Sequence, residues 1–200
     1  MKKTILLPAL LVVLSGCHRT GPVPEGVRYV SRAEWGAAAP LRPMQTHRID
    51  RITIHHTGSP QAPARTIEDK LQGLQRFSQA EAALEDGRRR AAWADIPYHL
   101  YVGTDGSVGE GREIHFAGES NTPYDPTGHL LVVVEGNFEN EPLTEAQRRT
   151  LDRLIPALAR RYHVPPDRIA GHKDYAETLC PGKALYADLP RLRSLAASVR

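Results

Sequence analysis

The sequence has little cysteine, no large excess of charge of one sign, and no apolar run long enough to cross a membrane. Its 200 residues include two cysteines, and 26 Lys and Arg stand against 23 Asp and Glu, which gives a formal net charge of +3. This near balance gives no support to nucleic-acid binding, which needs a basic surface. No internal repeat is visible, and the length suits a single core. We therefore expect one folded domain and a tail.

The N-terminal segment has the features of a targeting signal. Two lysines precede an apolar run at residues 5–14, which is too short to span a bilayer as a helix. The run ends in Leu14-Ser15-Gly16-Cys17, which resembles the lipobox of bacterial lipoproteins. We expect a signal peptide over 1–16, lipid on Cys17 and a Pro- and Gly-containing tether over 17–26. The alternative is an ordinary signal peptide with an incidental cysteine.

Two further expectations follow from a lipidated Cys17. His18 stands where an aspartate would resemble an inner-membrane retention signal, so we expect the lipid to anchor the protein in the outer membrane, facing the periplasm. Cys180 then has no cysteine partner, and no disulfide is expected. Cys180 is left as a buried apolar side chain, a nucleophile or a metal ligand.

Hydrophobic patterns predict a mixed α/β domain over 27–200, with a central β-sheet flanked by helices. The expected strands are 51–56, a hairpin of 98–102 and 107–110 around Thr104-Asp105-Gly106, and a buried strand at 130–134. The expected helices are 66–84 and a second one from Thr144 to Tyr162, which starts with a Thr144–Gln147 capping box. Pro156 should interrupt and bend the second helix, at a cost of about 3 kcal/mol unless packing compensates.

Three residues of the types that bind zinc draw attention. His55 lies near the end of an expected strand, while His172 and Cys180 lie on one loop, eight residues apart. A catalytic zinc site needs three such ligands in a tetrahedron, with the fourth position left open for water. Each residue also has an ordinary explanation, as a surface or capping histidine or a core cysteine. Spacing alone leaves both readings open.

Six separated segments form an ordered set of motifs: VSRAEWGA at 30–37, ITIHHT at 52–57, WADIPYHL at 93–100, GSVGEGR at 106–112, AGH at 170–172 and TLCPG at 178–182. Together they resemble one family, the zinc-dependent N-acetylmuramoyl-L-alanine amidases related to phage amidase lysozymes and peptidoglycan recognition proteins. The resemblance covers nearly the whole domain. It implies one zinc ion at one end of the sheet, held by His55, His172 and Cys180. In this family the cysteine separates catalytic members from recognition modules.

The resemblance also implies a reaction and catalytic groups. The bond cut would join N-acetylmuramic acid to L-alanine in peptidoglycan, with zinc lowering the pKa of its water to about 7. Tyr98 would hydrogen-bond the water or the developing negative charge. Phage amidases have a lysine at the position of Thr178, whereas catalytic recognition proteins have a threonine there, as this chain does. Glu135 corresponds to a glutamate that related amidases lacking the tyrosine use, so it either acts as a base or reaches solvent.

The remaining implied residues concern the substrate. His115 resembles a histidine of the family's cleft wall, Asn121 lies near the asparagine of that segment, and His56 is a neighbour of the first ligand. The family's Ser-Ile-Gly motif is replaced by His-Leu-Leu at 129–131, which puts the packing of that strand in doubt. We expect a monomer that binds peptidoglycan or muropeptides, with the membrane reached through its lipid.

Two other functions compete with this reading. A lipid-anchored recognition module would bind peptidoglycan without cutting it. A thiol hydrolase would use Cys180 as the nucleophile and His172 as the base, and would be indifferent to metal.

Overall fold

The computed structural model describes residues 22–83, 87 and 89–198. The predicted signal peptide, the predicted lipidation site Cys17 and Leu84 lie outside these residues. Within the described part of the chain, no helix is both long and apolar enough to span a membrane.

A six-stranded mixed sheet forms the centre of the domain, in the order β1-β6-β5-β7-β2-β8. Its strands are β1 (Tyr29–Val30), β2 (Arg51–His56), β5 (Leu100–Val102), β6 (Val108–Glu110), β7 (His129–Val134) and β8 (Ile169–Gly171). Strand β2 runs parallel to both β7 and β8, and β7 runs parallel to β5. Strands β5 and β6 form the predicted antiparallel hairpin. These pairings confirm the predicted mixed α/β class.

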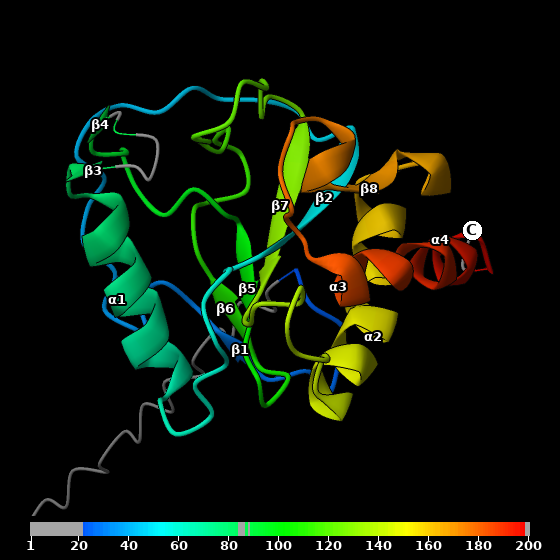
Figure 1. The fold of residues 1–200 in the computed structure, drawn as a ribbon. Coiled ribbons are helices and arrows are strands. Elements are labelled where there is room, and N and C mark those ends of the chain that lie inside the picture. Colours follow the sequence, from blue (N-terminus) through cyan, green and yellow to red (C-terminus); the bar gives the residue numbers. More distant parts are fainter. Residues whose placement is uncertain (1–21, 84–86, 88, 199–200) are drawn as a thin grey trace, which may run out of the picture.

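Helices cover both faces of this sheet (Figure 1). Helix α1 (Ile67–Ser78) packs on one face, while α2 (Glu145–Arg161) and α4 (Leu189–Ser198) pack on the other. The short helix α3 (Lys183–Ala187) directly precedes α4. Two 3-10 turns, η1 (Pro166–Arg168) and η2 (His172–Asp174), flank β8. A two-stranded hairpin, β3 (Ala82–Ala83) with β4 (Arg89–Arg90), follows α1.

Alternation along β2 decides which face of the sheet receives His55. Ile52 and Ile54 belong to the core under α2 and α4. His55 points to the opposite face, because successive side chains of a strand alternate. Its register partner is Val133, which packs with Leu71 of α1. His55 therefore lies on the α1 side of the sheet.

Helix α1 ends at Ser78, so the prediction of a helix to residue 84 is wrong. The guanidinium of Arg90, from β4, donates to the carbonyl oxygens of Phe77 at 2.7 Å and Ser78 at 3.0 Å, which satisfies groups at the helix C-terminus. The Phe77 side chain is 57% exposed. The apolar pattern that suggested a longer helix therefore includes a residue that does not reach the core.

Helix α2 begins with the predicted capping box and continues through Pro156 to Arg161, so the predicted interruption is wrong. Proline removes one backbone hydrogen bond from a helix interior. Pro156 is itself buried, and its neighbours Leu154 and Ile155 are buried in the core. Burial of this apolar face offsets the lost bond, at roughly 25 cal/mol per Å² of buried area.

The predicted buried strand is confirmed as β7, and it also includes His129. All six of its residues are buried, and they pair with β2 from Arg51↔His129 to His56↔Val134. The His129 ring fits because its Nδ1 lies 2.7 Å from the hydroxyl oxygen of Thr53. The departure from the family motif at 129–131 therefore leaves the strand pairing intact.

Acidification should destabilise the protein through His99. This buried ring accepts a hydrogen bond from the Leu131 N–H and contacts the Phe116 carbonyl through Nε2 at 2.8 Å. Burial lowers the pKa of His99 to about 3. The unfolded chain therefore takes up a proton first as the pH falls below 6.5, and the free energy of unfolding drops by roughly 1.4 kcal/mol per pH unit from this group.

Urea unfolding at pH 6.5 and pH 5 measures this effect, with a His99→Gln variant as the control. Stability should fall by about 2 kcal/mol more in the wild type than in the variant over this interval, although the variant starts less stable. An identical pH dependence in the two proteins contradicts the assignment.

Candidate metal centre

Parallel pairing of β2 with β8 brings two predicted ligands together. Ile54 pairs with Gly171 at the carboxyl ends of the strands, and the next residues are His55 and His172. The centroids of these two imidazole rings lie 4.5 Å apart. The loop before α3 places Cys180 next to these two rings. The candidate ligand atoms of His55, His172 and Cys180 all lie within 4.8 Å of one another, and all three side chains are buried.

The geometry of these three residues, which we call the triad, fits a zinc ion. Cys180 Sγ lies 3.6 Å from His55 Nδ1. Zinc bonds of about 2.1 Å to nitrogen and 2.3 Å to sulfur at a tetrahedral angle place two ligand atoms about 3.6 Å apart. The nitrogen that fits this geometry is His55 Nδ1; the other ring nitrogen, Nε2, is buried and has no hydrogen-bond partner among the described residues.

Burial sets the protonation states of the triad. It lowers the pKa of His172 to about 4 and that of His55 well below its usual value, so both rings are neutral near pH 7. Burial also raises the pKa of the Cys180 thiol to about 12, partly opposed by a hydrogen bond from the His56 backbone. Neutral imidazole is the form that binds metal. Cys180 must lose its proton both as a zinc ligand and as a nucleophile, so its raised pKa does not separate these two roles.

Backbone contacts hold Cys180 in place. The His56 N–H donates to Cys180 Sγ at 3.4 Å, and the Cys180 N–H donates to the Thr178 hydroxyl oxygen at 3.2 Å. Gly182 has φ +87°, and a Cβ there would lie 2.5 Å from a backbone atom of Phe138. Only glycine fits this turn. The structure therefore brings the predicted residues His56 and Thr178 to the centre.

The His56 side chain itself has a different partner. Its Nδ1 accepts a hydrogen bond from the Phe138 N–H at 3.3 Å, and the ring is half-buried. These contacts give His56 a place beside the triad through its backbone, while its imidazole supports the loop that follows β7.

Tyr98 also lies beside the triad. Its ring centroid is 5.1 Å from that of His55, at an interplanar angle of 54°. Burial, followed by the negative charge that Cys180 can carry, raises the pKa of Tyr98. The phenol therefore stays protonated and can donate a hydrogen bond near the triad.

Glu135, the residue after β7, is held by structural contacts. Its Oε2 lies 2.8 Å from Lys70 Nζ and accepts from the Thr104 N–H at 3.0 Å, while Oε1 accepts from the Ala62 N–H at 3.0 Å. Glu135 and Lys70 are both buried. The pair fixes α1 on the sheet, and the carboxylate is already engaged by partners outside the triad. Its predicted catalytic role stays a prediction.

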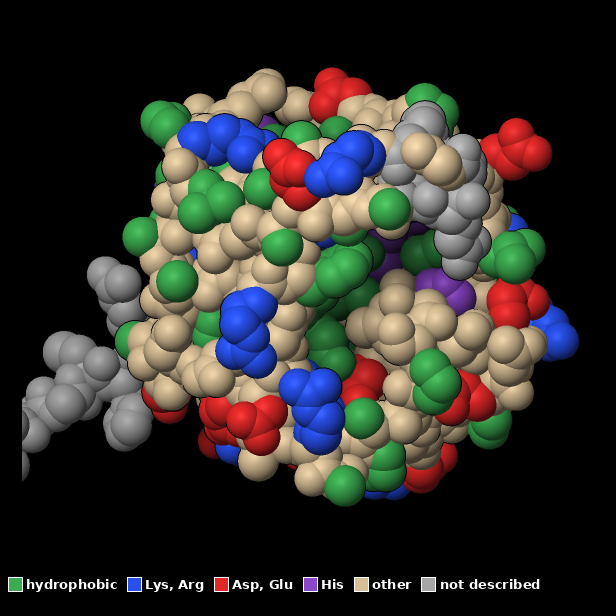
Figure 2. Space-filling model, turned by 60° about the vertical axis from the view of Figure 1, so that its left-hand side comes forward, with side chains coloured by type: hydrophobic (Ala, Val, Ile, Leu, Met, Phe, Trp, Pro, Cys, Tyr) green, Lys and Arg blue, Asp and Glu red, His purple; other side chains and the backbone are tan. Residues whose placement is uncertain are grey.

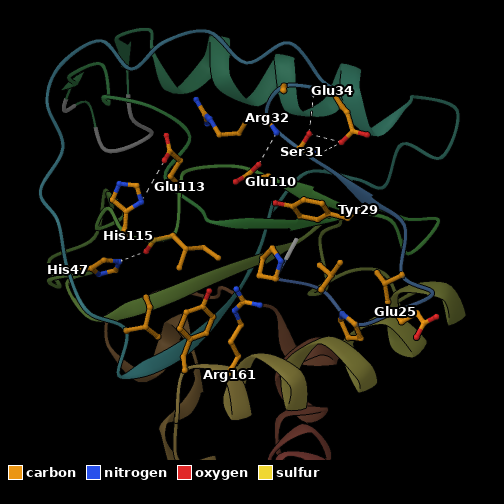
Figure 3. Close-up of a pocket in the computed structure, with 18 of the residues that line it drawn as sticks. Glu25, Tyr29, Ser31, Arg32, Glu34, His47, Glu110, Glu113, His115 and Arg161 are labelled. Atoms are coloured by element: carbon orange, nitrogen blue, oxygen red, sulfur yellow. Dashed lines mark hydrogen bonds and ion pairs between the residues drawn. The ribbon is translucent and has the colours of Figure 1, made fainter. Parts of the chain in front are cut away.

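The structure does not bring His115 to the triad. His115 lines an open pocket of about 1650 Å³ between the segment 22–34 and the end of α2, together with His47 and Glu113 (Figure 3). None of the triad residues lines this pocket. Asn121 is exposed and lies next to Thr122, which does contact the triad. The substrate-binding roles predicted for both residues remain untested.

In the loop between Gly118 and Gly128, sequence reasoning selected Asn121 but missed Thr122 and Tyr124, the residues that contact the triad. The hydroxyl oxygen of Thr122 lies 2.7 Å from His172 Nε2, and the Tyr124 ring centroid lies 5.0 Å from that of His172. This loop has no helical or strand periodicity. Its one signal is the alternation of hydroxyl side chains at Ser120, Thr122 and Tyr124.

The face of the molecule on the α1 side is hollowed (Figure 2). Apolar side chains, in green, line the hollow, and histidine side chains, in purple, lie at its upper right end. The class defined by this fold and cluster is a mixed α/β domain with a His-His-Cys candidate zinc centre at the carboxyl ends of its parallel strands.

Comparison with known proteins identifies the family. The family model described as N-acetylmuramoyl-L-alanine amidase matches residues 45–183. This chain belongs to that family.

Curated relatives include both enzymes and recognition proteins. The chain is 31% identical to peptidoglycan-recognition protein SD of Drosophila simulans, over 89% of this chain and 90% of that protein. It is 32% identical to the N-acetylmuramoyl-L-alanine amidase of Mus musculus, over 78% of this chain, but spans only 29% of that longer protein. A human recognition protein, PGRP-IBETAC, solved in complex with glycosamyl muramyl pentapeptide, matches with a TM-score of 0.66 at 28% identity, over 80% of this chain and 92% of that one.

The Lys70–Glu135 pair should behave as a coupled structural unit. Lys70→Met leaves a buried carboxylate without its cation, and Glu135→Gln leaves a buried ammonium without its anion, so each should cost about 3 kcal/mol of unfolding free energy. The double variant should lose clearly less than the sum, as measured by urea unfolding. Additive losses mean that the two side chains do not interact as described.

Proposed function

We propose that this protein is a zinc-dependent N-acetylmuramoyl-L-alanine amidase that hydrolyses the bond between N-acetylmuramic acid and L-alanine in peptidoglycan. The main observation behind this proposal is that the triad is complete and buried, with Cys180 Sγ 3.6 Å from His55 Nδ1. Relatives named as amidases and a relative solved with a muramyl pentapeptide support the substrate class. Three converging metal ligands favour an enzyme over a recognition module.

The side chains divide the chemistry between them. His55, His172 and Cys180 would hold the zinc ion. When bound, zinc supplies a water that ionises near neutral pH and polarises the scissile carbonyl. Tyr98, kept protonated by burial, donates a hydrogen bond to the carbonyl oxygen as it gains negative charge. Thr178 accepts from the Cys180 N–H, which leaves its own hydroxyl proton for a second hydrogen bond.

The proposed place of action is the cell envelope. The N-terminal sequence favours a lipid on Cys17, and we propose that it tethers the domain to the outer membrane, on the periplasmic side. Such a tether would keep the enzyme beside peptidoglycan without a membrane-spanning segment.

Release of stem peptides from intact sacculi tests the reaction. The purified protein should release peptides with a free N-terminal L-alanine, detected by mass spectrometry, and a chelator should abolish the release until zinc is restored. Cys180→Ser should still bind sacculi and release at least about 100-fold less, since a weaker ligand replaces the thiolate.

Two outcomes contradict the proposal. Tight sacculus binding by the zinc-loaded wild type without peptide release indicates a recognition module. Release that resists chelation but is lost on alkylation of Cys180 indicates a thiol hydrolase.

Removing the Tyr98 hydroxyl should slow the chemical step alone. In Tyr98→Phe we expect kcat to fall about 100-fold, which is the usual loss of one oxyanion donor. Zinc content, measured by elemental analysis, and Tm should match those of the wild type, because the ring still packs on His55. An unchanged kcat assigns Tyr98 a packing role only.

A further inference from the structure

A short chain of hydroxyl groups leads away from His172. His172 Nε2 lies 2.7 Å from Thr122 Oγ1, and Thr122 Oγ1 lies 2.7 Å from Ser120 Oγ. The Thr122 backbone N–H donates to the same Ser120 oxygen at 3.1 Å. The two hydroxyls thus form a connected pair at a buried imidazole, on the side of the ring that carries Nε2.

The contact with Thr122 determines which nitrogen of His172 is left to bind metal. A neutral imidazole carries one proton, and a ligating nitrogen must be bare. With Nε2 facing Thr122, Nδ1 is the nitrogen left for the triad. The proton then sits on Nε2 and is donated to Thr122 Oγ1, while either oxygen can be the donor between the Thr122 and Ser120 hydroxyls.

Packing against His172 cannot make this choice. The rings of His55 and Tyr124 lie 4.5 Å and 5.0 Å from His172, centroid to centroid, and they limit how the ring tilts. A ring turned over by 180° fills nearly the same space, so these contacts do not distinguish Nδ1 from Nε2. The hydroxyl of Thr122 does distinguish them, because it bonds one nitrogen only.

We propose that Thr122, supported by Ser120, is a positioning residue of the metal centre that fixes the tautomer and orientation of His172. This inference rests on the proposed zinc function. Metal-bound histidines commonly donate their second N–H to a carboxylate, a carbonyl or water. A hydroxyl performs the same orientation without adding negative charge, so it does not increase the basicity of the imidazole as a carboxylate would.

Zinc affinity of the apoprotein, measured without substrate by competition with a chromophoric chelator, tests the inference. Thr122→Val keeps the shape and removes the hydroxyl, and it should weaken zinc binding 10- to 100-fold, which is the usual effect of losing such a partner. Thr122→Ser keeps the hydroxyl and should stay within about threefold of the wild type. Ser120→Ala, which removes only the second link, should fall between them and replaces Thr122→Val if that variant does not fold.

A second readout follows the tautomer directly. In the zinc-loaded wild type, ¹⁵N chemical shifts should show His172 protonated at Nε2 alone, and in Thr122→Val a second His172 species should appear. Equal affinity and one tautomer in all variants overturn the inference while leaving the proposed function intact. A wild type that fails to bind zinc overturns the proposed function itself.

Discussion

The centre depends on the pairing of β2 with β8. These strands are far apart in the sequence, and their parallel register sets Ile54 opposite Gly171, so the following residues, His55 and His172, emerge side by side. Gly171 itself is closely surrounded, because a Cβ there would lie 2.9 Å from atoms of Pro181 and Tyr186. The same close packing presses the Cys180 loop against the strand ends. The register therefore positions two of the candidate ligands, and the packing of Pro181 against Gly171 brings the loop that carries the third.

Buried polar groups hold the walls around this centre. The Arg112 guanidinium, 1% exposed, donates to the carbonyl oxygens of Asp95, Ile96 and Ala117. It thereby ties the segment before Tyr98 to the start of the loop that carries Thr122. Unsatisfied groups at such depth would be costly, so these contacts keep the two segments in a fixed relation. Arg112 therefore supports both segments: the one that carries Thr122, proposed to position His172, and the one that carries Tyr98, proposed to donate to the substrate.

The sequence predicted the core better than the edges. Strand β7 and the β5–β6 hairpin follow from apolar runs and turn residues, and the Thr144 capping box marks the start of α2. Helix α1 is shorter than predicted, since Arg90, from a later hairpin, satisfies its last carbonyls at Phe77 and Ser78. The effect of Pro156 was overestimated because its own burial compensates. In both cases a contact from outside the segment overrode a local rule.

The same distinction applies to the candidate centre. Residue types and ordered motifs were enough to select His55, His172, Cys180 and Tyr98, because a family motif keeps the chemical identity of each side chain in the sequence. Only the tertiary structure decided which groups surround them. Glu135 is engaged by Lys70, and Thr122 faces His172, since loops without periodicity approach a site through folding of the whole chain. Sequence determines which groups are available, and the packing of distant segments determines which of them meet.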